Sequence, residues 1–379
     1  MKTPVLGPVR LAALGLSLLV AACATDSATA PPTLEGASMN VTASSVSIVM
    51  SGLDAPRGMA WGPEGGLYVI EAGNTSLSGP CATVARGTNC YSGTGAVTRY
   101  WRGNQERVAS GLPSFYNPAV FDIGGPQDIG FQGRGNARVT IGWGADPATR
   151  AQLGDLAEGF GSLLQLNPSG GWKILADVSA FEAANNPAGG PFDSNPYGLL
   201  VEPGRTFIAD AGGNSLLEVK NNGEISLVAT FAPIPVPPGP FNPPFAMSDP
   251  VPTEVLRRAD GAFDVSLLSG APFLPGAASV MRVVPGQAPS ISEGGFAMIT
   301  DIDRGPDGSL YVLQYASAPF FGGPGQLIRI APDGSRTVLT TALSQSTSVL
   351  AGPDGAVYVT TNGNREGVGE VLRFGPPMK

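Results

Sequence analysis

The sequence predicts an all-β fold, a six-bladed β-propeller with four-stranded blades. Three observations lead to this prediction. A tight turn followed by a strand-like triplet recurs six times, further strand-like segments accompany each copy, and the segment missing from the last copy is found near the N-terminus. The composition agrees: 53 Gly and 36 Pro among 379 residues supply many turns, and charged residues are only 14%, which disfavours a helical bundle.

The repeat is clearest where a Gly-Pro-Asp-Gly or Gly-Pro-Glu-Gly turn leads into alternating aromatic and β-branched residues. Such turns reverse the chain tightly, and the alternation suits a strand. An apolar segment precedes each copy, a third strand-like segment follows it, and a fourth comes after a short turn, so each unit predicts one four-stranded sheet. The six copies lie at residues 62–69, 133–139, 203–208, 260–265, 305–312 and 352–359.

The last unit lacks its fourth strand, because it stops at Phe374 after the third. Residues 45–53 match the fourth-strand segment 105–112 of the first unit. We therefore expect the N-terminal strand to complete the last blade. Such pairing closes the ring and covers the edges of the end sheets.

Residues 1–22 have the pattern of a lipoprotein signal peptide. Lys2 and Arg10 precede an apolar run of 12 residues, which is too short for a permanent membrane span. The run ends in Leu-Val-Ala-Ala before Cys23, which resembles a bacterial lipobox and predicts lipidation of Cys23. Ordinary signal cleavage beside an incidental cysteine is the alternative.

The segment after the signal peptide predicts the location of the protein. Ala24 rather than Asp follows the lipobox cysteine, which for bacterial lipoproteins implies the outer membrane, facing the periplasm or the exterior. Residues 23–40 are small, polar and Pro-containing and predict a flexible tether, and residues 41–379 hold the propeller. We expect a monomer that meets the membrane only through its lipid anchor.

Export makes a disulfide between Cys81 and Cys90 the expected state of these two residues. They are nine residues apart in a segment rich in Gly, Ser, Thr and Pro, and exported proteins meet an oxidising environment. A two-cysteine metal site is disfavoured because no further soft ligands lie nearby.

Several function classes are disfavoured by composition and by missing motifs. The chain has no His, which removes a Ser-His-Asp triad and imidazole metal ligands. The net charge of −8 makes nucleic acid a poor partner. No Walker A loop, dinucleotide fingerprint or nucleophile elbow is present.

The long connections should all emerge on one face of the propeller, because successive loops of a meander alternate between the two ends of the strands. Long loops on a rigid scaffold commonly carry function; neutral insertions are the alternative. The long connections are 71–95, 143–160, 177–195, 232–251, 269–277 and 315–325. Two pieces of these connections, 147–160 and 179–186, are expected to be helical.

Three acidic residues should converge at the channel mouth. Aligning the repeats places Asp128, Glu254 and Asp301 at one equivalent position of the innermost strands, together with Gly58, Gly198 and Ser348. An oxygen-only cluster suits Ca²⁺ or Mg²⁺. A shared proton and a solvated acidic channel without metal are the alternatives.

Further oxygen donors are expected near the same mouth and are candidates for a binding face: Glu71, Asp122, Asp193 and Asn195. Two of the acidic motifs, Asp210 to Asn214 and Glu71 to Asn74, follow equivalent second strands. Turn capping is the favoured role for their side chains.

Several segments carry a resemblance to a known family: 55–58 with the following turn, the loop of Cys81 and Cys90, 183–187, 193–199 and 209–214. On these segments the chain resembles the ScyD/ScyE family within the six-bladed NHL/SMP-30-like propellers. The resemblance implies the fold and export, and that family has no settled activity to transfer. SMP-30-like lactonases have a metal-binding Asn where this chain has Tyr197, which disfavours a lactonase and makes Tyr197 a binding-face candidate.

These observations favour an exported propeller that binds an unknown small molecule or a cell-envelope protein through its loop-rich face. No cofactor is expected with certainty. The alternative is a Ca²⁺- or Mg²⁺-dependent hydrolase, lactonase or lyase of the SMP-30-like kind that uses Asp128, Glu254 and Asp301. A third hypothesis is a structural module of cell-envelope assembly. Fold alone does not decide among them.

Overall fold

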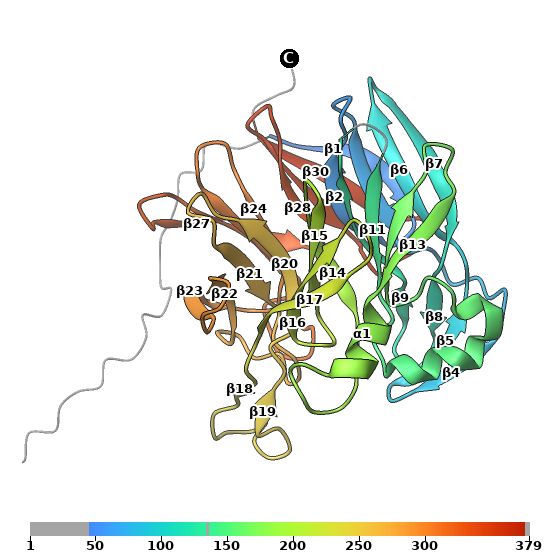
Figure 1. The fold of residues 1–379 in the computed structure, drawn as a ribbon. Coiled ribbons are helices and arrows are strands. Elements are labelled where there is room, and N and C mark those ends of the chain that lie inside the picture. Colours follow the sequence, from blue (N-terminus) through green and yellow to red (C-terminus); the bar gives the residue numbers. More distant parts are fainter. Residues whose placement is uncertain (1–44, 134–135, 376–379) are drawn as a thin grey trace, which may run out of the picture. The chain divides into compact units, whose positions relative to one another are not determined.

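A computed structural model describes residues 45–133 and 136–375. The regular secondary structure of these residues is almost entirely β-strand, with one α-helix and one 3₁₀ helix (Figure 1). The predicted signal peptide 1–22, the tether 23–40 and Cys23 lie outside the described residues. Within the described ranges, no helix has both the length and the apolar character needed to cross a membrane.

Six four-stranded antiparallel sheets correspond one to one with the six repeats, and we number them in chain order. Sheets 1 to 3 contain β2 (Pro56–Trp61), β3 (Leu67–Glu71), β6 (Gly95–Trp101) and β7 (Asn104–Leu112); β10 (Pro126–Phe131), β11 (Ala137–Ile141), β12 (Ser162–Leu166) and β13 (Trp172–Asp177); and β14 (Pro196–Glu202), β15 (Arg205–Asp210), β16 (Ser215–Lys220) and β17 (Ile225–Thr230).

Sheets 4 to 6 follow the same order, except that the last takes its fourth strand from the other end of the chain. They contain β20 (Pro252–Arg257), β21 (Phe263–Leu267), β22 (Ala278–Val283) and β23 (Ser290–Phe296); β24 (Ile299–Arg304), β25 (Leu310–Gln314), β26 (Gly325–Ile330) and β27 (Arg336–Leu343); and β28 (Val349–Ala351), β29 (Val357–Thr361), β30 (Gly369–Gly375) and β1 (Ser45–Leu53).

The N-terminal strand closes the structure as predicted. β1 pairs antiparallel with β30, with Ile48 opposite Leu372 and Val46 opposite Phe374. The first strands of the six sheets lie innermost and pack beside one another in chain order, and β28 of sheet 6 packs against β2 of sheet 1. The predicted all-β architecture of four-stranded sheets is therefore confirmed.

Threonine hydroxyls link neighbouring sheets near the axis. Thr253 Oγ1 donates to the carbonyl oxygen of Ile299 at 2.9 Å, and Thr300 Oγ1 donates to that of Ser346 at 3.0 Å. Thr347, at the equivalent position of sheet 6, donates to the carbonyl oxygen of Pro56 at 2.7 Å. This last bond joins the final sheet to the first.

The apolar core lies between the faces of neighbouring sheets. Phe207 of sheet 3 and Phe263 of sheet 4 pack with ring centroids 4.6 Å apart, and Tyr68 of sheet 1 meets Phe131 of sheet 2 at 4.7 Å. Successive side chains of a strand point to opposite faces of its sheet, so each sheet can present apolar residues to the sheets on both sides of it. The repeat therefore explains the packing as well as the strands.

The repeated turn also explains a repeated ion pair. Gly308 has φ of 80°, a left-handed conformation that glycine adopts without strain. The acidic residue before it, Asp307, pairs with Arg329 on the third strand of the same sheet at 2.7 Å. Asp354 pairs with Arg373 at 2.7 Å in the same way. Turn and third strand are thus tied together in each of these sheets.

The long connections gather at one side of the sheets, the lower side in Figure 1. This agrees with the expectation that they share one face. A small sheet of four short strands, which the sequence did not reveal, lies there together with a 3₁₀ helix, an α-helix and a hairpin. These elements are β4 (Cys81–Val84), β5 (Gly87–Tyr91), β8 (Phe115–Asn117) and β9 (Asp122–Gly124), then η1 (Pro147–Ala157), α1 (Val178–Asn185), β18 (Ile234–Pro235) and β19 (Met247–Ser248).

The disulfide and one of the two helices predicted for this face are confirmed, and the second helix differs from the prediction. The disulfide between Cys81 and Cys90 is present and joins β4 to β5. The helix expected at 179–186 is α1, whose N-cap Asp177 accepts a hydrogen bond from the Ala180 N–H at 2.9 Å. The expected helix 147–160 is instead the shorter 3₁₀ helix η1, which is kinked at Gly154 because that residue has φ of 60° and ψ of −136°.

Candidate functional site

The axial carboxylates occupy equivalent places in three innermost strands. Asp128 lies two residues after Pro126, Glu254 two residues after Pro252, and Asp301 two residues after Ile299; in each case the first residue is paired with the neighbouring strand and a register shift follows. The alignment of the repeats therefore predicted a true structural equivalence for these three positions.

The three carboxyl groups lie close enough to affect one another. Burial raises the pKa of Asp128 to about 7, although main-chain N–H donors oppose the shift. Burial also raises the pKa of Glu254 well above its usual range, and the charges of Asp128 and Asp301 raise it further. Burial, and then the charge of Asp128, also raise the pKa of Asp301 well above its usual range, while hydrogen bonds from Ser348 and from the Val349 N–H oppose the shift.

Two of these carboxylates act as ties between neighbouring sheets. Asp128 accepts from its neighbour Ile129 N–H at 2.8 Å and from Leu199 N–H of sheet 3 at 2.9 Å. Asp301 accepts from Ile302 N–H at 2.7 Å and from Val349 N–H of sheet 6 at 2.8 Å. All four carboxylate oxygens thus already accept a main-chain hydrogen bond.

The glycines at the equivalent positions make room for the carboxylates. A Cβ atom on Gly58 would lie 2.0 Å from Asp128 Oδ1, and one on Gly198 would lie 2.7 Å from Glu254 Oε2. Such distances are far inside van der Waals contact. Glycine at positions 58 and 198 is therefore required by the carboxylate of the next sheet, Asp128 and Glu254 respectively.

The axial carboxylate oxygens are partly engaged within the protein. Asp128 and Asp301 each accept two main-chain hydrogen bonds, whereas Ca²⁺ and Mg²⁺ need several oxygen ligands. Across residues 45–133 and 136–375, no group of three or more Asp, Glu, Cys or His residues is arranged to hold a metal. The assignment of Asp128, Glu254 and Asp301 as metal ligands stays a prediction.

An arginine, Arg57, and two tyrosines, Tyr197 and Tyr315, lie near the carboxylates. Arg57 was not among the residues predicted for the site. Arg57 is only 7% exposed and donates to the carbonyl oxygens of Gly363 and, at 2.7 Å, Ile123. Burial raises the pKa of Tyr197 and of Tyr315, and the positive charge of Arg57 opposes both shifts. The Ala-Pro-Arg-Gly motif at the start of the first inner strand was the available signal for Arg57.

Glu71, a candidate for the binding face, is fully buried and engaged in a structural role. Its carboxylate pairs with Arg107 at 2.6 Å and accepts from the Asp54 N–H at 2.7 Å and from Thr98 Oγ1. It thus ties three strands of sheet 1 to the chain entering that sheet. The role is structural, as expected for this motif, but Glu71 bonds to Asp54, Thr98 and Arg107 rather than capping the turn that follows it.

Asp122 and Asn195 lie at the loop-rich face. Asp122 begins β9 of the small sheet and is half-buried. Asn195 is half-buried. A Cβ atom on Gly142 would lie only 2.1 Å from Asn195 Oδ1, so glycine at position 142 leaves room for this side chain. The main-chain N–H of Asn195 donates to Asp210 Oδ1 at 2.6 Å. Asp210 also accepts from Gly213 N–H at 3.1 Å, so it caps this turn as expected.

The half-buried Asp193 belongs to a separate group of acids with the buried Glu182 of α1 and the buried Asp210. Burial raises the pKa of Glu182 to about 7, and the charges of Asp210 and Asp193 add to the shift. Burial and the charge of Asp210 raise the pKa of Asp193 to about 6, while Arg86 opposes it. Glu182 carried no sequence signal, because its partners come from a loop and a strand later in the chain.

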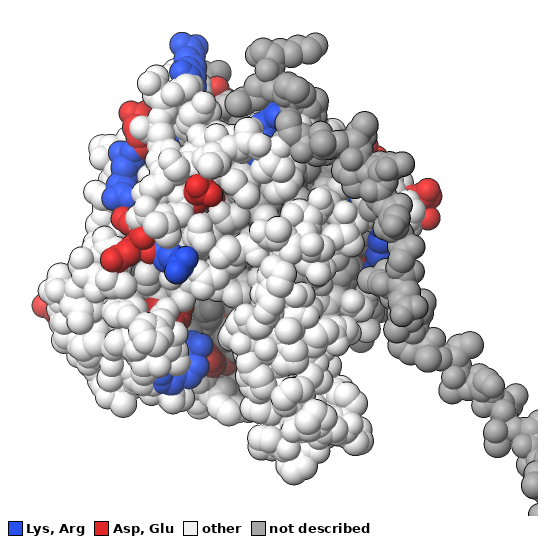
Figure 2. Space-filling model, turned by 180° about the vertical axis from the view of Figure 1, so that it is seen from behind, with Lys and Arg blue, Asp and Glu red and all other residues white. Residues whose placement is uncertain are grey.

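Aromatic side chains from three long connections meet at the loop-rich face. The ring centroids of Phe273 and Phe321 are 4.2 Å apart, and those of Phe241 and Phe320 are 5.6 Å apart. Phe320 and Phe321 are each 51% exposed. No charged residue occurs between positions 232 and 248, and Figure 2 shows an uncharged protrusion at the lower edge of the molecule, where the β18–β19 hairpin lies.

The structure is similar to those of several solved proteins at low sequence identity. An oxidoreductase described as a glucose dehydrogenase from Thermus thermophilus has a TM-score of 0.52 and 18% identity, covering 87% of this chain and 99% of its own. A pyrroloquinoline quinone-bound aldose sugar dehydrogenase from Streptomyces coelicolor has a TM-score of 0.51 and 14% identity, covering 87% and 97%.

The calcium-binding protein regucalcin from Agrobacterium tumefaciens has a TM-score of 0.49 and 11% identity, covering 89% of this chain and 96% of its own. No protein-family model matches the chain, and no curated protein sequence matches it. The likenesses with TM-scores above 0.5 show the fold alone, and that fold is a β-propeller.

Proposed function

We propose that this protein is a non-catalytic, exported β-propeller that binds a ligand or a partner through its loop-rich face. The observation that carries the proposal is the gathering of the long connections on one side of the sheets, where hydrogen bonds join loops that are distant in sequence. The Gly144 N–H donates to the carbonyl oxygen of Ser194 at 3.0 Å and so joins two of the long connections. Thr75 N–H donates to Glu366 Oε2 at 2.7 Å and so joins a third long connection to the loop between β29 and β30.

The axial carboxylates support binding rather than hydrolysis. A metal-dependent hydrolase needs carboxylates that are free to ligate the ion and polarise a substrate. Here two of the three carboxylates hold neighbouring sheets together through main-chain N–H groups. Removal of either would therefore disturb the scaffold rather than a metal centre.

The sequence pattern before the propeller supports a lipid anchor in the outer membrane, facing the periplasm or the exterior. The lipobox-like residues up to Cys23 carry this part of the proposal. The motifs at 193–199 and 209–214, which resemble those of the ScyD/ScyE family, agree with an exported propeller. Membrane-extracted protein should gain the mass of a lipid group, and a Cys23→Ser variant should not; unmodified wild-type protein would contradict the anchor.

Metal analysis and thermal unfolding separate binding from metal-dependent catalysis. For the purified wild-type protein we expect no stoichiometric divalent metal, no change in Tm with millimolar Ca²⁺ or with chelator, and no turnover of lactone and ester substrates. Stoichiometric metal that is lost in an Asp301→Ala variant, together with turnover that is lost in parallel, would overturn the proposal in favour of the hydrolase.

A further inference from the structure

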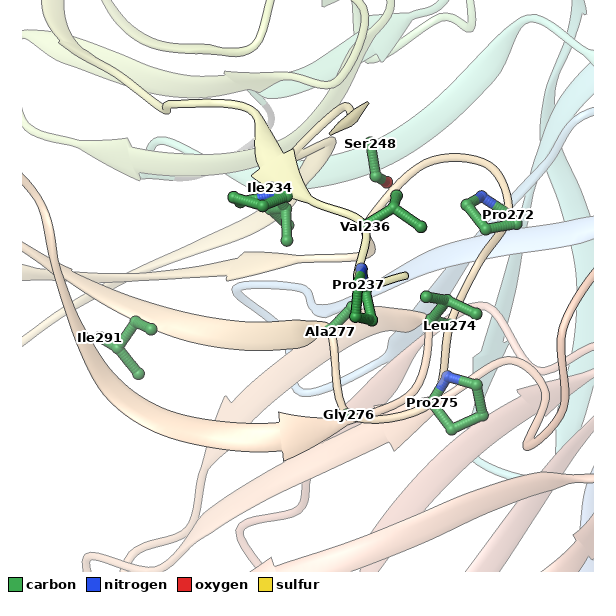
Figure 3. A pocket seen from close by; sticks show the side chains of 11 residues that line it. Ile234, Val236, Pro237, Ser248, Pro272, Leu274, Pro275, Gly276, Ala277 and Ile291 are labelled. Atoms are coloured by element: carbon green, nitrogen blue, oxygen red, sulfur yellow. The ribbon is translucent and has the colours of Figure 1, made fainter. Parts of the chain in front are cut away.

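A cavity of about 420 Å³ lies between the β18–β19 hairpin and the loop 272–277 on the loop-rich side (Figure 3). Val236 and Pro237 from the hairpin segment face Leu274 and Ala277 from the loop, as Figure 3 shows. Ile291 of β23 forms one end of the lining. The volume of the cavity falls within the range typical of pockets for small molecules, about 300 to 1,000 Å³.

The lining is almost wholly apolar. Apart from Gly276, it consists of aliphatic residues, four prolines and one serine, and it contains no charged residue. The serine, Ser248, donates its hydroxyl to the carbonyl oxygen of Gly270 at 2.8 Å. No charged side chain is therefore available to pair with a charged group of a ligand.

The walls of the cavity are fixed to each other and to the sheets. Asn242 Nδ2 donates to the carbonyl oxygen of Val236 at 2.8 Å, and the Gly270 N–H donates to that of Asp249 at 2.7 Å. The Gly276 N–H donates to the carbonyl oxygen of Phe296 in sheet 4 at 2.7 Å. Since proline also restricts the backbone, little ordering is needed when a ligand enters.

The apolar character continues beyond the cavity. Phe273 stands between the lining residues Pro272 and Leu274 and packs on Phe321 with ring centroids 4.2 Å apart. One face of this loop therefore lines the cavity while its aromatic side chain joins the exposed phenylalanine cluster.

We propose that this cavity binds an uncharged, apolar small molecule. The inference rests on the proposed function, because it assigns the ligand class and the place on the loop-rich face. A charged ligand is disfavoured since burying an unpaired charge is costly, and a peptide segment is too large for this volume. The apolar lining and the preformed walls together favour a compact ring system or a short hydrocarbon.

Two probes with the same aromatic skeleton test the charge argument. N-phenyl-1-naphthylamine is neutral, whereas 8-anilinonaphthalene-1-sulfonate carries a sulfonate on that skeleton. We expect fluorescence titration to give saturable one-to-one binding of the neutral probe, and binding of the charged probe weaker by at least about tenfold because its charge would be unpaired in the cavity. Equal binding of both probes, or none of the neutral probe, would overturn the proposal.

A pair of matched substitutions tests the location. Ala277→Trp fills the cavity and should weaken binding of N-phenyl-1-naphthylamine by about tenfold or more, because the space needed for the probe is lost. Ala188→Trp places the same side chain on an exposed loop outside the cavity and should leave binding unchanged. Thermal unfolding of both variants verifies that they fold; an Ala277→Trp variant that folds and binds normally would overturn the proposal.

A third variant distinguishes failure of the cavity from failure of the proposed function. Loss of probe binding in Phe320→Ser but not in Ala277→Trp would reject the cavity and place apolar binding elsewhere on the loop-rich face. The metal and substrate measurements are independent of the probes, so turnover would reject the proposed function whatever the probes show. Binding that is lost in Ala277→Trp and kept in Phe320→Ser would support the cavity itself.

Discussion

Asp301 on β24 accepts a hydrogen bond from the Val349 N–H on β28 at 2.8 Å, across the boundary between sheets 5 and 6. The same relationship recurs between Asp128 of sheet 2 and Leu199 of sheet 3 at 2.9 Å. Two of the three acidic residues that converge on the axis thus join neighbouring sheets. Their positions are explained by the need to satisfy main-chain N–H groups in the crowded centre.

The first prediction concerns this tie. Asp301→Ala leaves the Ile302 and Val349 N–H groups without their acceptor, and an unsatisfied buried donor costs about 1 to 3 kcal/mol. We expect the free energy of unfolding in urea to fall by about 2 kcal/mol. Asp155→Ala is the control, because Asp155 is exposed in η1, and it should change stability by less than about 0.5 kcal/mol. Equal values for both variants would contradict the role of Asp301.

The second prediction concerns the buried acids at α1. The pKa of Glu182 is raised to about 7 by burial, Asp210 and Asp193. A carboxyl group with a raised pKa in the folded state contributes stability below its unfolded pKa, and that contribution is lost as pH rises through the folded value. The contribution of Glu182 should therefore decrease from about pH 4.5, near its unfolded pKa, to about pH 7, its folded pKa.

Glu182→Gln removes this charge while keeping the shape of the side chain. At pH 8 we expect the variant to be more stable than the wild type by about 1 kcal/mol or more, since one pKa unit corresponds to about 1.4 kcal/mol. At pH 5 the two proteins should differ less. Chemical unfolding at both pH values measures the effect, and Glu158→Gln at an exposed position controls for net charge. A wild type more stable than Glu182→Gln at pH 8 would contradict the explanation.

The repeats revealed the sheets because a turn and an alternating strand are local signals. The same alignment predicted that Asp128, Glu254 and Asp301 meet, since equivalent positions of the inner strands face one axis. It could not reveal that Asp128 and Asp301 bond to the next sheet, because this depends on how neighbouring sheets are offset.

The small sheet on the loop-rich face had no comparable signal. β8 and β9 have three residues each, too few to show a period of two, and β5 pairs with β8 across more than twenty intervening residues. Glu182 likewise meets Asp193 and Asp210 only through the course of the chain in space. Local patterns predict elements, whereas such non-local contacts need the tertiary structure.

The third prediction concerns the disulfide. Cys81 and Cys90 are nine residues apart, and the chain-entropy model assigns about 2 to 3 kcal/mol to closing a loop of this length. We expect the Cys81→Ser, Cys90→Ser double variant to lose about 2 kcal/mol of unfolding free energy. Reductant should lower wild-type stability by a similar amount and leave the variant unchanged. Sensitivity of the variant to reductant would show that another effect is being measured.

The fourth prediction tests closure of the ring. Thr347→Val keeps the side-chain shape but removes the hydrogen bond to the carbonyl oxygen of Pro56, which joins sheet 6 to sheet 1. We expect a loss of about 1 kcal/mol. Thr300→Val removes the equivalent bond between sheets 5 and 6 and should cost about the same. If only Thr300→Val is destabilising in urea unfolding, the contact between the last and first sheets does not form in solution.

The fifth prediction concerns the ion pair of Glu71 and Arg107. Glu71 is fully buried, whereas the Arg107 side chain is 44% exposed, and Glu71 Oε2 lies 2.6 Å from an Arg107 guanidinium nitrogen. Arg107→Met leaves the buried carboxylate without its cation. Breaking a fully buried pair costs about 3 to 5 kcal/mol, and because solvent screens the exposed part of Arg107 we expect a smaller loss of about 2 kcal/mol.

A second substitution separates the lost attraction from the uncompensated charge. Glu71→Gln in the Arg107→Met background removes that charge, so the double variant should regain about 1 to 2 kcal/mol relative to Arg107→Met alone. A double-mutant cycle from urea unfolding measures the coupling, with Arg102→Met, an exposed arginine of the β6–β7 turn, as the control. If Glu71→Gln destabilises the Arg107→Met protein further, the hydrogen bonds that Glu71 accepts from Thr98 and Asp54 outweigh the cost of its unpaired charge.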